Sequence, residues 1–279
     1  MPTIDLRGLA MSYEQTGSGP DIVWVSGGGS RGRDWHPYQV PWFADRFRNT
    51  TFDNRGIGGT RPLDADAPES WSIEDMADDL AELIERVCTP PVYCVGLSMG
   101  SLITQKLAIR RPELLRSAIV MGTLARAYDW PYDFMKAEIE WRRAGRSLSG
   151  MMGATHYAAF SYPASALGDP AVLANIYRYL DSEEWTEGNE ESLVPQWEAC
   201  NAYDVTAELP TCAARIDVIA FEQDVQTPPV FGREVARLAA DSSFRMIPDS
   251  GHYSCWGHRH DEINQAIDDI IAADARGSA

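Results

Sequence analysis

The fold of this chain is decided by one stretch, Val92-Tyr93-Cys94-Val95-Gly96-Leu97-Ser98-Met99-Gly100. Its first four residues are mostly apolar and have the length of a buried strand, and a helix-period segment follows from Met99 to about Arg110. Residues 96–100 fit the pattern Gly-x-Ser-x-Gly, in which a serine occupies a strained turn between strand and helix and its hydroxyl projects over the edge of a sheet. With a strand before it and a helix after it, the pattern predicts Ser98 as a nucleophile rather than a helix cap.

Apolar runs of strand length recur on both sides of this stretch and alternate with helix-period segments. The alternation is typical of an α/β fold, with a mostly parallel central sheet and crossover helices. One helix is expected after Ser72, which can cap it, and a final helix carries Ile263, Ile267 and Ile270 on one face. Strands are expected at residues 22–25, 50–52, 92–95, 118–121, 216–221 and 244–247.

The strand signal vanishes between residues 123 and 210, a segment that holds 13 of the chain's 28 aromatic residues. We interpret it as a helical cap insert that folds back over the sheet, so the core domain comprises residues 1–122 and 211–279. Most of these aromatic side chains are expected to form the insert's own core. The candidates for lining a substrate pocket are Trp130, Phe134, Trp141, His156 and Tyr157.

A nucleophilic serine needs a base, and the base needs a carboxylate that orients it. His252 follows the last expected strand in a loop at the carboxyl edge of the sheet, which makes it the one histidine placed to reach Ser98. Asp224 follows the strand at 216–221 at the same edge, with Glu222 as its nearest rival, whereas Asp249 is expected to shape the turn before His252. The order Ser98, Asp224, His252 therefore predicts a catalytic triad.

The oxyanion that forms when a serine attacks a carbonyl must be held by preset backbone amides. One donor is expected to be the amide of Met99, directly after the nucleophile. The second is expected from the glycine-rich loop after the strand at 22–25, with Gly28 preferred and Gly29 as the alternative. A phosphate-binding loop is disfavoured because no Gly-Lys-Ser/Thr follows these glycines.

Composition excludes several other classes of function. The formal net charge of −17 argues against a nucleic-acid partner, which needs a basic footprint. No apolar stretch approaches the roughly 18 residues needed to span a bilayer, and the first residues do not form a secretory signal. The five cysteines are scattered, so neither a disulfide framework nor a metal site is indicated and a cytoplasmic setting is expected. Lys106 and Lys136 are the sole lysines among 24 basic residues, a bias that suggests a bacterial source.

Taken together, four features resemble the α/β-hydrolase superfamily, especially its esterase, lactonase and cofactor-free haloperoxidase-like members. The features are Ser26-Gly27-Gly28-Gly29, Asp53-Asn54-Arg55-Gly56-Ile57-Gly58, the motif at 96–100, and Asp224 with His252. The resemblance implies that the insert covers the active site and sets substrate choice. It also implies that the Asp53–Gly58 element braces the loops beside the site.

The predicted activity is hydrolysis of an ester, thioester or lactone of a small-to-medium apolar substrate, through an acyl-enzyme and without a cofactor. Two alternatives stay open. The first is a non-hydrolytic reaction that uses the same triad, such as carbon–carbon bond cleavage, peroxidation, elimination or cyclisation. The second is a ligand-binding protein without catalysis, against which the intact triad argues. The expected partner is a small-molecule substrate, and the sequence does not predict the oligomeric state.

Overall fold

The computed structural model describes residues 2–64, 70–146, 148, 150–180 and 190–277. Its centre is a nine-stranded sheet in the order β1-β2-β4-β3-β6-β7-β8-β9, with β5 paired to β2. From β4 to β9 each strand pairs in parallel with its neighbour. This arrangement confirms the predicted fold class. The strands are β1 (Thr3–Leu6), β2 (Leu9–Thr16), β3 (Asp21–Val25), β4 (Arg48–Phe52), β5 (Arg61–Pro62), β6 (Val92–Leu97), β7 (Leu115–Met121), β8 (Ile216–Phe221) and β9 (Ser242–Ile247).

Each of the six strands expected from an apolar run is present, and most begin a few residues earlier than predicted. The sequence pattern did not reveal β1, β2 and β5, which form the antiparallel edge of the sheet. β1 has four residues and is largely exposed, and β2 mixes apolar with polar residues. Such short or mixed edge strands lack the continuous apolar run of a central parallel strand.

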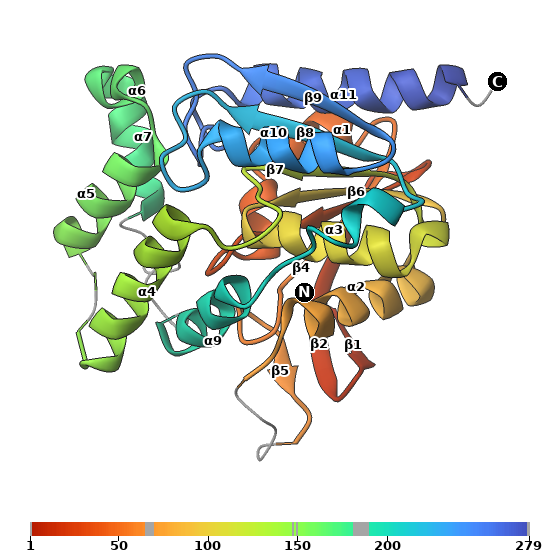
Figure 1. Ribbon diagram of the computed structural model, residues 1–279, viewed down its shortest axis with the longest axis horizontal. Helices are drawn as coiled ribbons and strands as arrows, with labels where there is room; N and C mark the ends of the chain where they lie inside the picture. Colours follow the sequence, from red (N-terminus) through yellow and green to blue (C-terminus); the bar gives the residue numbers. More distant parts are fainter. Residues whose placement is uncertain (1, 65–69, 147, 149, 181–189, 278–279) are drawn as a thin grey trace.

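Two layers of helices cover the sheet (Figure 1). One core cluster packs beneath α2, α3 and α10, and a second packs beneath α1 and α11. Ser72 caps α2 as predicted, because its Oγ accepts a hydrogen bond of 3.1 Å from the Asp75 amide. These helices are α1 (Gln39–Phe43), α2 (Ile73–Val87), α3 (Met99–Arg110), α10 (Pro229–Leu238) and α11 (His260–Gly277).

Five further helices of the described residues lie between β7 and β8 and gather at one side of the sheet (Figure 1). The two ends of this insert meet, since the Val205 amide donates to the Ala125 carbonyl and the Ala127 amide to the Tyr203 carbonyl. The insert therefore leaves and re-enters the core at one place. Its helices are α4 (Asp129–Arg143), α5 (Gly150–Ser161), α6 (Ala164–Gly168), α7 (Pro170–Leu180) and α9 (Glu190–Asn201).

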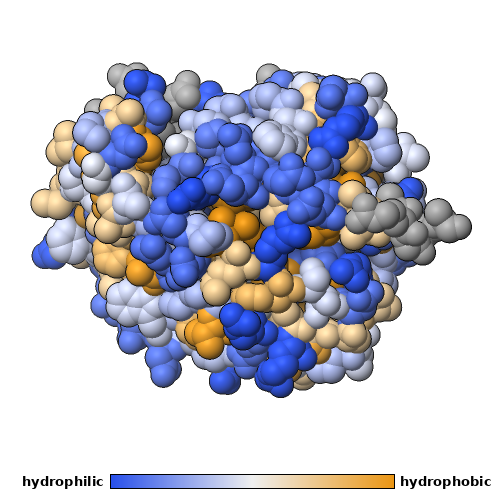
Figure 2. Space-filling model, turned by 90° about the horizontal axis from the view of Figure 1, so that it is seen from above, coloured by the Kyte–Doolittle hydropathy of each residue, from blue (hydrophilic) through white to orange (hydrophobic). Residues whose placement is uncertain are grey.

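The surface is mostly hydrophilic. In the view from above, hydrophilic side chains dominate and break the hydrophobic ones into small groups (Figure 2). Within the described ranges, no helix combines the length and the apolar character that crossing a bilayer requires.

Candidate active site

Ser98 occupies the sharp turn between β6 and α3. Its backbone has φ 55° and ψ −123°, in the positive-φ region that a non-glycine residue rarely adopts. Two close approaches explain the flanking glycines. A Cβ atom on Gly96 would lie 2.3 Å from the Gly100 carbonyl oxygen, and one on Gly100 would lie 2.1 Å from the Val25 carbonyl oxygen. The turn therefore requires both glycines and holds Ser98 at the carboxyl end of β6, as the Gly-x-Ser-x-Gly pattern predicts.

His252 and Asp224 are brought together from loops that follow β9 and β8. His252 Nδ1 donates to Asp224 Oδ2 over 2.7 Å, and both side chains are almost fully buried. The other carboxylate oxygen of Asp224 accepts from the amides of Gln226 and Thr227, each at 2.9 Å. The Thr227 hydroxyl donates to Oδ2, also at 2.9 Å. Four donors thus fix the carboxylate, and the carboxylate leaves Nε2 as the imidazole nitrogen that can accept a proton.

The rival carboxylates have other roles. Glu222 is exposed and accepts a hydrogen bond from the Asp249 amide at 2.8 Å. Asp249 accepts from Arg259 and from the Ser165 hydroxyl, so it braces the turn before His252. Neither carboxylate contacts the imidazole. Of these three carboxylates, Asp224 is the one that contacts His252.

Ser98 and His252 both lie beside the end of β7. The Ser98 amide donates to the Met121 carbonyl at 3.0 Å, and a Cβ atom on Gly122 would lie 3.0 Å from His252 Cε1. In the described part of the chain His252 Nε2 is buried without a hydrogen-bond partner, so no bond yet joins it to Ser98. Catalytic hydrogen bonds of this kind are often long without substrate and tighten when it binds.

The loop after β3 supplies the candidate oxyanion donors. Gly29 is excluded as a free donor, because its amide donates to Gln196 Oε1 at 2.9 Å. The amide of Gly28 has no partner among the described residues, and the amide of Met99, the first residue of α3, has none within its helix. This distinction favours Gly28 over Gly29.

The Asp53–Gly58 element braces the same loop. Asp53 Oδ1 accepts from the Gly32 amide at 2.8 Å, and Asn54 Nδ2 donates to the Ser26 carbonyl at 3.1 Å. Both bonds tie the end of β4 to the segment that follows β3. The element therefore holds the loop in place without reaching the cavity.

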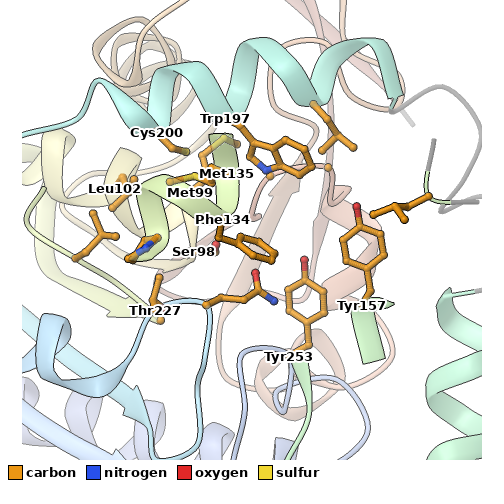
Figure 3. A pocket seen from close by; sticks show the side chains of 18 of the residues that line it. Ser98, Met99, Leu102, Phe134, Met135, Tyr157, Trp197, Cys200, Thr227 and Tyr253 are labelled. Carbon is orange, nitrogen blue, oxygen red and sulfur yellow. The ribbon is translucent and has the colours of Figure 1, made fainter. Parts of the chain in front are cut away.

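A cavity between the sheet edge and the insert contains Ser98 at its base (Figure 3). Most of its lining is apolar, and α4 and α9 supply much of it. Apart from the loop glycines, its lining residues are Ser98, Met99, Leu102, Leu124, Pro131, Phe134, Met135, Arg142, Leu148, Tyr157, Leu193, Trp197, Cys200, Gln226, Thr227 and Tyr253.

Of the five pocket residues expected from the sequence, Phe134 and Tyr157 line this cavity and three do not. Trp130 is 47% exposed, and its Nε1 donates to the Val225 carbonyl. Trp141 is 42% exposed and stacks beneath the Arg146 guanidinium. His156 lies behind Phe134 and bonds to Glu138 at 2.9 Å. The high number of aromatic residues predicted the insert. It did not predict which side of each helix faces the cavity.

Cys200 is a second potential nucleophile in the lining. Burial raises the pKa of its thiol to about 12, so the thiol stays protonated at neutral pH. Cysteine chemistry at this site is therefore disfavoured. The described residues contain no group of three or more His, Cys, Asp or Glu side chains arranged to hold a metal ion.

A doubly covered parallel sheet with a serine on the β6–α3 turn and a His–Asp pair at the same edge defines an α/β-hydrolase. The chain belongs to the alpha/beta hydrolase family, whose sequence profile matches residues 22–266.

Among its relatives is BpoC of Mycobacterium tuberculosis, named provisionally as a non-heme bromoperoxidase. It is 33% identical over 260 residues, which cover 93% of this chain and 96% of that protein. Its crystal structure has a TM-score of 0.86 to this chain and covers 95% of it, with 96% of that chain matched.

Two other relatives carry names of ester-cleaving enzymes. The pimeloyl-acyl-carrier-protein methyl ester esterase of Aeromonas hydrophila is 32% identical over 127 residues, covering 44% of this chain and 46% of that protein. The enol-lactonase of Burkholderia xenovorans LB400 shares the fold, with a TM-score of 0.81, 24% identity, and coverage of 97% and 100%. The chain thus belongs to a family of enzymes, and the proteins similar to it carry esterase, lactonase and bromoperoxidase names.

Proposed function

We propose that this protein is a serine hydrolase that cleaves an ester, thioester or lactone of a small-to-medium apolar substrate. The observation that carries the proposal is the buried His252–Asp224 pair beside the strained turn of Ser98. A nucleophile, a base and a group that orients the base are the three parts that acyl transfer to serine needs.

In the first half of the reaction Ser98 Oγ attacks the acyl carbonyl carbon while His252 Nε2 takes the hydroxyl proton. The Asp224 carboxylate stabilises the imidazolium, and the amides of Gly28 and Met99 hold the oxyanion. The intermediate then collapses, His252 returns the proton to the departing oxygen or sulfur, and an acyl-enzyme remains. Water activated by His252 releases the acid in the second half.

The lining supports an apolar acyl group. Leu102, Leu124, Phe134, Met135 and Leu193 surround the space above Ser98, and burying an apolar chain among them removes its surface from water. Leu102 belongs to α3 of the core domain, whereas Phe134 and Met135 belong to α4 of the insert. Both parts of the chain would therefore contact the acyl group.

A second candidate is peroxidation with the same residues, and one observation favours it. BpoC, a relative that matches over nearly its whole length, is named for a bromoperoxidase activity. In that reaction hydrogen peroxide would replace water in the second half, so the acyl-enzyme would yield a peracid.

The deciding experiment measures product formation from a panel of 4-nitrophenyl esters, thioesters and lactones, with and without hydrogen peroxide. We expect hydrolysis of short-to-medium acyl groups by the native enzyme and a loss in kcat on the order of 10⁶ in Ser98→Ala. A peracid that forms faster than the acid would favour the second candidate. A rate close to the native one in Ser98→Ala would contradict both.

A further inference from the structure

Helix α9 of the insert is fastened to the candidate oxyanion loop. Gln196 is fully buried; its Oε1 accepts from the Gly29 amide at 2.9 Å, and its Nε2 donates to the Arg55 carbonyl at 3.1 Å. One turn earlier, Leu193 packs on Gly29, where a Cβ atom would lie 2.7 Å from Leu193 Cδ2. Because residues three and four apart share a helix face, these contacts direct Leu193, Gln196 and Trp197 toward the loop.

The edge of the Trp197 ring lies over Gly28. A Cβ atom built on Gly28 would lie 3.4 Å from Trp197 Nε1 and 3.7 Å from its Cδ1. The Arg142 guanidinium covers one face of the ring, with Cζ 5.2 Å from a ring centroid. Figure 3 shows the indole projecting from α9 with its nitrogen on the side that faces the cavity. The Arg142 guanidinium and the attachment of α9 to the loop hold the ring in place. Its N–H edge therefore lies beside the expected position of the oxyanion.

The Trp197 N–H has no hydrogen-bond partner in the part of the chain that the structure describes. Indole N–H groups usually find a partner when they are buried. Once an apolar chain fills the cavity and expels water, this donor would lose its solvent partner, which disfavours a purely hydrocarbon ligand. A ligand with a hydrogen-bond acceptor next to the Trp197 N–H would replace the lost water.

The position of the donor indicates which part of the substrate it contacts. The oxyanion points to the amides of Gly28 and Met99, and the leaving group must point to His252, which accepts and returns its proton. Thr227, which contacts His252, and Trp197 lie on opposite sides of Ser98 in the view of Figure 3. The Trp197 N–H therefore faces the acyl side and not the leaving group.

We propose that Trp197 Nε1 donates a hydrogen bond to a second oxygen on the acyl group, close to the scissile carbonyl, and that the preferred substrates carry such an oxygen. The class comprises esters and thioesters of 3-oxa, 3-oxo or 3-hydroxy acids. This inference rests on the proposed hydrolase function and narrows its substrate. It makes Trp197 a specificity-determining residue.

The test compares two substrates of the same size in Trp197→Phe, which keeps an aromatic ring but removes the N–H. The substrates are 4-nitrophenyl ethoxyacetate and 4-nitrophenyl pentanoate, which differ by one ether oxygen in place of a methylene. The measured quantity is the ratio of their kcat/KM values, and comparing this ratio between enzymes cancels the intrinsic reactivity of the two esters. We expect Trp197→Phe to lower the ratio about tenfold, as the loss of one hydrogen bond predicts.

The control is Trp42→Phe in α1, a half-buried tryptophan outside the cavity, which should leave the ratio unchanged. Unchanged kcat/KM values on both esters in Trp197→Phe would overturn the inference, because the ring would then act by packing alone. An equal loss on both esters would also overturn it, because the N–H would then serve the oxyanion common to both.

A binding measurement separates this inference from the proposed hydrolysis. In the Ser98→Ala background, ligand-observed NMR titration gives Kd for methyl ethoxyacetate and methyl pentanoate without turnover. We expect tighter binding of the ethoxyacetate, and loss of that preference when Trp197→Phe is added. If the native enzyme hydrolyses no ester, the proposed function fails while the Kd ratio still decides the role of Trp197. Equal Kd values for the two ligands would refute that role.

Discussion

Replacing His252 with alanine is expected to lower kcat on an activated ester by a factor on the order of 10⁶, and adding Ser98→Ala should cost almost nothing more. The reason is that Ser98 and His252 act as one unit, since a hydroxyl without a base is a poor nucleophile and a base without the hydroxyl has no proton to take. The measurement is steady-state turnover of the two single variants and the double variant. Losses that multiply in the double variant would show that the two residues act independently and would contradict the proposed mechanism.

Thermal unfolding provides the control for this set. Ser98 lines a cavity, and His252→Ala removes one of the four donors to the Asp224 carboxylate while the two amides and the Thr227 hydroxyl remain. Neither variant should therefore unfold at the assay temperature. The residual rate above water is expected to come from the oxyanion donors and from substrate binding.

The second large effect is expected from Asp224→Asn. An asparagine of the same shape can present its amide N–H₂ to Nδ1, which favours the tautomer that carries the proton on Nε2 and cannot accept the Ser98 proton. The expected loss in kcat is on the order of 10⁴. Glu222→Gln is the matched control, because Glu222 is exposed and bonds to the Asp249 amide rather than to His252.

Turnover of both variants should be measured on a substrate limited by chemistry. If Asp224→Asn keeps more than about a tenth of the native rate, the loss is below about 1.4 kcal/mol and Asp224 does not orient the base. A large loss in Glu222→Gln instead would move that role to Glu222.

The sequence predicted the parallel part of the fold because central strands, covered on both faces, must be continuously apolar. The same rule fails at the sheet edge. β2 mixes buried, half-exposed and exposed residues, and β1 has a single buried residue, so neither produces an apolar run. The sequence pattern also does not reveal α10, which begins at Pro229, because its buried residues are few and include Gly232.

The positions of Ser98, Asp224 and His252 could be anticipated because each follows a strand, and the carboxyl ends of parallel strands meet at one edge. The contents of the insert could not. Trp130, Trp141 and His156 are aromatic like Phe134, and the sequence does not tell which helix face turns toward the sheet. Gln196 is a polar residue in a helix and would be expected at the surface, yet it is fully buried against the loop at Gly29. A hydrogen bond between residues so far apart in the chain leaves no pattern in the sequence around either of them.

The central claim, that Ser98 is the nucleophile, is tested most directly by labelling with a fluorophosphonate probe and locating the adduct by peptide mass spectrometry. We expect one equivalent of probe, carried by the peptide that contains Ser98, and no labelling of folded Ser98→Ala. Labelling of His252→Ala should be strongly slowed, because the hydroxyl then lacks its base. An adduct on another serine, or a native protein that takes up no probe, would show that Ser98 is not the nucleophile.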